Sequence, residues 1–97
     1  MKIHHNKTKI IATWGPSCED KKVMTEMIKS GLDLFRFNFS HGTHEKHLEG
    51  FKKVRQITTE LEASIGILAD LQGPKIRVGK VLDNNQPLKA GHTITIT

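Results

Sequence analysis

Cysteine is nearly absent from this sequence, as are other features that would place the chain in a special class. Its 97 residues include one cysteine, Cys18, which excludes an intramolecular disulfide framework and favours a reducing compartment. No apolar run approaches the ~20 residues that a membrane-spanning helix needs, and residues 1–10 contain no apolar signal core. We therefore expect a cytoplasmic protein with no membrane partner.

A dense basic run is also missing, although the formal net charge is +5. A basic excess can indicate a nucleic acid partner. Here the lysines are spread along the chain, and binding of phosphorylated small molecules would explain the excess equally well. The sequence has no Walker motif and no G-x-G-x-x-G fingerprint. We expect no nucleic acid partner.

What the sequence does contain is an apolar periodicity that switches between two and 3.6 residues. It predicts strands over residues 8–14, 32–38 and 64–71 and helices over 20–30 and 44–62. This β-α-β-α-β order indicates an α/β fold with parallel strands and right-handed crossovers. The predicted buried helix faces carry Val23, Met24, Met27 and Ile28, then Leu48, Phe51, Val54, Ile57 and Leu61.

The pattern changes near Pro74. Residues 75–81 and 92–97 alternate as two short strands around the turn-rich stretch 82–91, which is typical of the start of an antiparallel β unit. The sequence therefore predicts two parts, with residues 1–74 in the α/β part and residues 75–97 in an incomplete β-domain.

The stretch FRFNFSHG, residues 35–42, alternates strictly between aromatic and polar residues. In an extended chain the three phenylalanines lie on one side and Arg36, Asn38 and Ser40 on the other. Parallel α/β proteins collect functional groups beyond the carboxyl ends of their strands. The third strand ends in Asp70 and the first in GPS, so we expect one polar site on a shared rim of the sheet.

Arg36 has two interpretations of equal weight. Its guanidinium group suits a phosphate or carboxylate ligand, and it equally suits a structural salt bridge to Asp70 or Asp33. Asn38, Ser40 and Asp70 offer oxygen atoms that suit a hard cation. Local turn and cap hydrogen bonds explain these residue types more often, so the residues alone favour that explanation.

Histidines recur at positions 41, 44 and 47. A spacing of three could align imidazoles on a helix face as zinc ligands. No fourth ligand is evident, and His41 precedes Gly42, outside the predicted helix. We therefore favour exposed histidines at a helix start over a zinc site.

Lys75 and Arg77 lie in the stretch QGPKIR, where a Gly-Pro turn lets the chain change direction. The two side chains alternate and so share one face of an extended segment. They either protect a solvated edge strand or hold a phosphate group, and their spacing leaves both interpretations open.

Three segments resemble the N-terminal part of pyruvate kinases, in order and at matching separations: TKIIATWGPS, FRFNFSHGTHEKH and ILADLQGPKIRVG. The resemblance extends over nearly the whole chain and is to the bacterial-type members in particular. It implies the start of a (β/α)8 TIM barrel with a small β-barrel domain inserted after the third strand. It also implies phosphoryl transfer between phosphoenolpyruvate and ADP, giving pyruvate and ATP, in a homotetramer that requires Mg²⁺ and often K⁺.

The resemblance further implies roles for individual residues. Arg36 is similar to the arginine that contacts the substrate phosphate. The side chains of Asn38, Ser40 and Asp70 and the backbone carbonyl of Leu71 resemble the ligands of a monovalent cation. The residues that resemble nucleotide contacts are Asn38, Phe39, Ser40, His41 and Arg77.

Three residues depart from the family pattern. Trp14 stands where a smaller aliphatic residue is usual, and nothing in the sequence explains it. Gln72 stands where many members have lysine, although other bacterial members share the glutamine. Lys75 stands where potassium-dependent members have glutamate. A fixed ammonium can replace the charge of a mobile cation and would repel a bound one, so we expect that K⁺ is not required.

A complete (β/α)8 barrel takes about 250 residues, so only its first three strands are expected here. The family's catalytic lysine and Mg²⁺ ligands lie later, outside this chain. We expect the chain alone to be inactive and, because its strand edges are unpaired, prone to self-association. The alternative is a short non-catalytic homologue that binds phosphate compounds or a partner protein.

Overall fold

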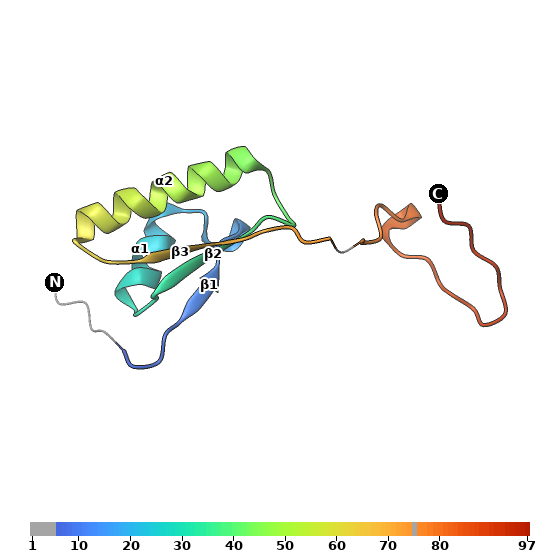
Figure 1. Cartoon of the computed structure of the whole chain (residues 1–97), viewed down its shortest axis with the longest axis horizontal. Coiled ribbons are helices and arrows are strands. Elements are labelled where there is room, and N and C mark those ends of the chain that lie inside the picture. The colour runs from blue at the N-terminus through green and yellow to red at the C-terminus, as the bar shows by residue number, and fades with distance from the viewer. Residues whose placement is uncertain (1–5, 75) are drawn as a thin grey trace.

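The computed structural model describes residues 6–74 and 76–97 and contains a small parallel sheet with two helices (Figure 1). Along the chain, the elements are β1 (Ile11–Thr13), a 3₁₀ turn (Pro16–Cys18), α1 (Lys21–Lys29), β2 (Leu34–Asn38), α2 (His44–Leu61), β3 (Gly66–Asp70) and a second 3₁₀ turn (Leu82–Asn84). The predicted α/β order is confirmed, although β1 is shorter than the predicted strand over residues 8–14.

The sheet has the order β1-β2-β3, and both strand pairs are parallel, as predicted. Its register places Thr13 beside Arg36 and Asn38 beside Asp70. Because all three strands run the same way, their carboxyl ends meet at one rim of the sheet.

Side-chain caps account for where the two helices begin. The Asp20 carboxylate accepts hydrogen bonds from the backbone N–H groups of Lys22 (2.8 Å) and Val23 (3.3 Å) at the start of α1. Thr43 Oγ1 accepts from the Lys46 N–H (3.2 Å) at the start of α2. Each cap satisfies backbone donors that have no partner within the helix.

Both helices cover the same face of the sheet. Met24 and Ile28 of α1 pack with Val54 and Ile57 of α2 in one buried cluster, together with Phe35 and Phe37 of β2. Burial alternates along β2, so Arg36 and Asn38 lie on the opposite, uncovered face. The predicted separation of aromatic and polar residues is therefore confirmed over residues 35–38, whereas residues 39–40 follow in a turn.

The predicted buried faces of the helices need correction in part. Val23 is exposed on α1, and Leu48 and Phe51 are exposed on α2. In the N-terminal half of α2, the positions that face the sheet are His47 and Gly50 instead. The apolar pattern missed them because a histidine and a glycine carry no hydrophobic signal.

Strands were predicted over residues 75–81 and 92–97, but the described residues 76–97 contain no strand. This segment extends away from the sheet (Figure 1), and the molecule measures 62 × 29 × 24 Å. A β-strand requires a hydrogen-bonded neighbour, and this segment has none in the described part of the chain. The exposed apolar residues here include Ile76, Val78, Ile94 and Ile96.

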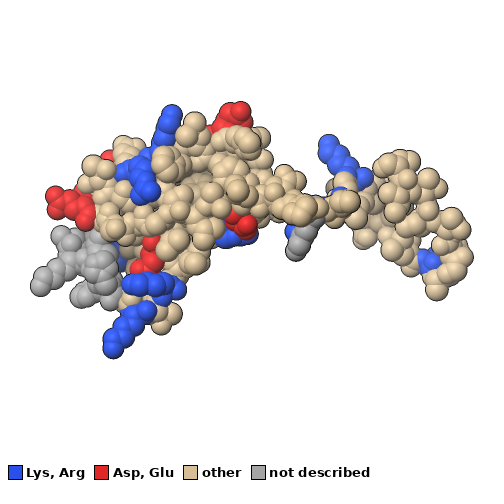
Figure 2. Space-filling model, in the orientation of Figure 1, with Lys and Arg blue, Asp and Glu red and all other residues tan. Residues whose placement is uncertain are grey.

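No helix in the described ranges has both the length and the apolar character to cross a bilayer. Charged side chains of both signs are interspersed over the visible face of the helix and sheet part (Figure 2). This face carries no continuous basic surface, in agreement with the even spread of lysines along the sequence.

Candidate functional site

The uncovered face of the sheet brings together polar side chains from the carboxyl ends of all three strands. Thr13 ends β1 and lies in register with Arg36, while Asn38 and Asp70 end β2 and β3 in register with each other. The backbone N–H of Phe39 donates to the Asp70 carbonyl (2.9 Å), which extends the pairing past the ends of the strands. The predicted polar rim is therefore present.

Arg36 forms the central interaction of this rim. Its Nε donates to Asp70 Oδ2 (3.0 Å), its Nη2 bonds the same oxygen, and its Nη1 donates to Thr13 Oγ1 (3.0 Å). Of the two predicted salt-bridge partners, Asp70 is the correct one, because Asp33 accepts from the Ile10 N–H (2.8 Å) instead. The Arg36 and Asp70 side chains remain 32% and 44% exposed, so the pair is open to a ligand.

Turn hydrogen bonds shape the loop that follows β2. Asn38 Oδ1 accepts from the Ser40 N–H (3.0 Å), and the Asn38 carbonyl accepts from the His41 N–H (3.2 Å). Gly42 then has a φ of +73°, a left-handed value that glycine adopts without strain. Local turn bonding thus accounts for Asn38 here, and its role as a cation ligand stays a prediction.

The three histidines have different environments. His41 and His44 are exposed, as predicted, but His47 is only 7% exposed. His47 Nε2 lies 2.7 Å from the His41 carbonyl oxygen, and its ring centroid lies 4.7 Å from that of Phe39. Within the described residues, no three potential ligands form a metal-binding group.

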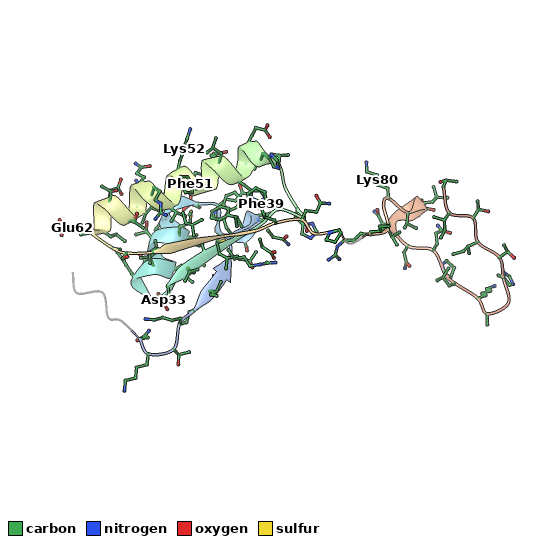
Figure 3. All side chains as sticks on the ribbon, in the orientation of Figure 1. Asp33, Phe39, Phe51, Lys52, Glu62 and Lys80 are labelled. Carbon is green, nitrogen blue, oxygen red and sulfur yellow. The ribbon has the colours of Figure 1, made fainter. Side chains whose placement is uncertain are left out.

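A shallow apolar groove of about 390 Å³ lies on the helix side of the sheet, away from the polar rim. Phe39 lies beside the N-terminal half of α2, and Phe51 projects from that helix (Figure 3). The residues that line the groove are Phe37, Phe39, His44, His47, Leu48, Phe51, Ile67 and Ala69.

Three of the predicted site residues lie beyond the end of β3. Leu71 directly follows Asp70 and is exposed. Arg77 is exposed in the segment that leads away from the sheet (Figure 1), so the structure does not bring it to the rim. Lys75 lies outside the described residues.

Sequence reasoning missed Thr13 and the buried position of His47. Thr13 had a usable signal, since it ends the first strand just as Asn38 and Asp70 end theirs. The sequence signal for His47 was weaker. His47 lies one turn after the N-cap residue Thr43, so its side chain is on the side of α2 that faces back toward the loop.

Comparison with known proteins links this arrangement to one family. The family model described as "Pyruvate kinase, barrel domain" matches residues 5–97. Pyruvate kinase 2 of Synechocystis sp. is 48% identical over 93 residues, which cover 94% of this chain and 16% of the relative. Pyruvate kinase of Thermococcus litoralis is 42% identical over 97 residues, which cover 100% of this chain and 20% of the relative.

Solved structures agree with the sequence comparison. The crystal structure of Cryptosporidium parvum pyruvate kinase matches with a TM-score of 0.68 at 38% identity, covering 75% of this chain and 15% of that chain. The chain thus spans about a fifth or less of the length of these relatives. Because the family model covers residues 5–97 and these relatives are 42–48% identical over nearly the whole chain, the chain belongs to the pyruvate kinase family.

Proposed function

We propose that residues 1–74 form the N-terminal part of the (β/α)8 catalytic barrel of a pyruvate kinase and that residues 75–97 begin its inserted β-domain. The whole enzyme would be a cytoplasmic homotetramer that transfers a phosphoryl group between phosphoenolpyruvate and ADP, giving pyruvate and ATP. The observation that carries this proposal is the polar rim, where Arg36, Asn38 and Asp70 meet at the carboxyl ends of parallel strands.

In this proposal Arg36 binds the phosphate group of the substrate. Phosphoryl transfer depends mainly on positive groups held around spread negative charge. Asp70 and Thr13 hold the guanidinium from two sides, so its direction is set before a ligand arrives. Phe39, Ser40 and His41 would contact the nucleotide together with Asn38. Arg77 lies away from these residues here, so its contact with the nucleotide would require the rest of the enzyme to bring it to the rim.

The rim also has the chemistry of a monovalent cation site, formed by Asn38, Ser40, Asp70 and the carbonyl of Leu71. Both bonds from Arg36 go to Oδ2 of Asp70, which leaves Oδ1 without a partner among the described residues. Oxygen donors of this kind suit K⁺ and other hard cations. The Mg²⁺ that the reaction requires would bind residues outside these 97 positions.

A hybrid enzyme tests the activity without depending on how far the native chain extends. Residues 5–97 would replace the matched segment of Synechocystis pyruvate kinase 2, with phosphoenolpyruvate-dependent ATP formation as the assay. We expect the hybrid to be active and Arg36→Met to lower its kcat/KM by about 10²-fold or more, because a charge that stabilises the transition state is lost.

The matched control removes a charge elsewhere. Lys29→Met on α1, where the ammonium group pairs only with Glu26 among the described residues, should leave the hybrid fully active. A folded but inactive hybrid, or an Arg36→Met variant with full activity, would refute the proposal. The 97-residue chain by itself should show no turnover.

Potassium dependence tests the proposed role of Lys75. We expect turnover of the hybrid to change little when K⁺ replaces a non-binding cation, because the ammonium group supplies the charge. Lys75→Glu should make the hybrid depend on K⁺. Strong activation of the unsubstituted hybrid by K⁺ would show that Lys75 does not replace the cation.

A further inference from the structure

His47 is a buried polar side chain that the proposed chemistry does not use. It lies in the first turn of α2, and its Nε2 is 2.7 Å from the carbonyl oxygen of His41. A carbonyl oxygen only accepts hydrogen bonds, so Nε2 must carry the proton. Nδ1 is buried without a partner among the described residues, where an unpaired N–H would be costly. The geometry therefore selects the Nε2–H tautomer.

Packing holds the imidazole in place. Its centroid lies 4.7 Å from the Phe39 ring, 5.9 Å from the Phe37 ring and 6.0 Å from the Trp14 ring. On its other side, a Cβ built on Gly42 would lie 3.4 Å from Cε1 and Nε2. The ring thus fills the space between the aromatic cluster and the loop.

The loop that His47 contacts is the proposed nucleotide-contacting stretch. Its first anchor is local, because Asn38 bonds the N–H groups of Ser40 and His41. The hydrogen bond from His47 adds an anchor from a different element. One anchor ties the loop to β2 and the other to α2, so two rigid elements determine its conformation.

We propose that His47 is a positioning residue for nucleotide binding. Its Nε2–H holds the His41 carbonyl and thereby presents residues 38–41 to the nucleotide in one conformation. His47 acts through His41 and does not itself contact the ligand. This inference rests on the proposed function, since it takes residues 38–41 as the nucleotide contacts.

The first test uses NMR spectroscopy on the 97-residue chain. Long-range ¹⁵N spectra should show His47 as the Nε2–H tautomer. His47→Phe, which keeps an apolar ring and removes the donor, should shift the amide signals of residues 40–42. His47→Gln keeps an N–H donor at a similar reach and should shift them much less. His44→Phe, an identical change at the exposed histidine one turn earlier, is the matched control.

The second test uses the hybrid enzyme. His47→Phe should raise KM for ADP roughly three- to tenfold, as expected for one lost hydrogen bond. Its kcat and its KM for phosphoenolpyruvate should change much less, because Arg36 lies on the strand and not on the loop. His47→Gln should restore KM for ADP, and His44→Phe should leave it unchanged. If His47 only stabilised the fold, His47→Phe would change KM for ADP and KM for phosphoenolpyruvate to a similar extent.

The outcomes separate this inference from the proposed function. An Nδ1–H tautomer, or unchanged loop amides in His47→Phe, overturns the positioning role whatever the hybrid does. An active hybrid in which His47→Phe and His47→Gln have the same KM for ADP also overturns it. An inactive unsubstituted hybrid refutes the proposed function, and the nucleotide part of the inference with it.

Discussion

Gly50 explains why a tryptophan fits at position 14. A Cβ built on Gly50 would lie 2.7 Å from two ring atoms of Trp14 and 2.8 Å from the Phe37 ring. The two rings stack with centroids 5.3 Å apart and are almost fully buried, so they have little room to move. The bulky residue that directly follows β1 thus depends on the missing side chain of Gly50 in α2.

At this residue scale, we predict that Gly50→Ala destabilises the chain. Alanine favours a helix over glycine by ~1 kcal/mol, but overpacking of a core costs about 1–3 kcal/mol, and the second effect should dominate. In a Trp14→Leu background the same substitution should cost less, because the 2.7 Å contacts with the Trp14 ring are removed while the 2.8 Å contact with the Phe37 ring remains. Urea unfolding measures both differences, and an equal cost in the two backgrounds would disprove the coupling.

At the scale of elements, one ion pair between the described residues joins α1 to α2. Lys21 Nζ donates to Glu60 Oε1 (2.8 Å), and Gln56 donates to the same oxygen (3.1 Å). The hydrogen bond from Lys21 is the main reason why the pKa of Glu60 lies below its ordinary value of 4.5. Folding therefore favours the ionised carboxylate.

This shift predicts a pH dependence of helix docking. A carboxyl group whose pKa is lower in the folded state than in the unfolded state stabilises the fold at pH values above its unfolded-state pKa. This stabilisation is lost as the pH falls through the folded-state pKa. Glu60→Gln should thus be less stable than the original chain at pH 7, by a small amount because the pair is exposed. The difference should vanish well below pH 4.5.

Thermal unfolding between acidic and neutral pH measures this difference. Lys21→Met is the matched background, since Glu60→Gln should have almost no effect once its partner is gone. A difference that persists unchanged at acidic pH, or in the Lys21→Met background, would rule out the ion pair as its source.

At the scale of the whole molecule, the sheet and α2 both leave surfaces uncovered. With the order β1-β2-β3, the outer edges of β1 and β3 have no partner strand among the described residues. Leu48 and Phe51 stay exposed beside the apolar groove. Open strand edges and contiguous apolar surface both favour association.

We therefore predict that the 97-residue chain self-associates as its concentration rises. Light scattering should give a mass above that of the monomer, and Leu48→Lys together with Phe51→Lys should lower it. Leu82→Lys together with Leu88→Lys, which adds the same number of charges in the exposed C-terminal segment, is the control and should have little effect. A concentration-independent monomer would count against this prediction.

The apolar spacing of the sequence predicted both helices to within one residue at each end. Residues 20–30 were predicted and α1 is Lys21–Lys29, while residues 44–62 were predicted and α2 is His44–Leu61. Sequence reasoning also placed Arg36, Asn38 and Asp70 on one rim. These features follow from local pattern, because caps, apolar spacing and strand alternation act over a few residues.

The sequence by itself determined the α/β order, the helix limits and the polar face of β2. Only the tertiary structure decided that Arg36 pairs with Asp70 and that His47 is buried under the loop. It also decided that Gly50 makes room for Trp14 and that residues 76–97 form no strand. The physical reason is that each of these features depends on which distant segment lies alongside, and a local pattern carries no information about that neighbour.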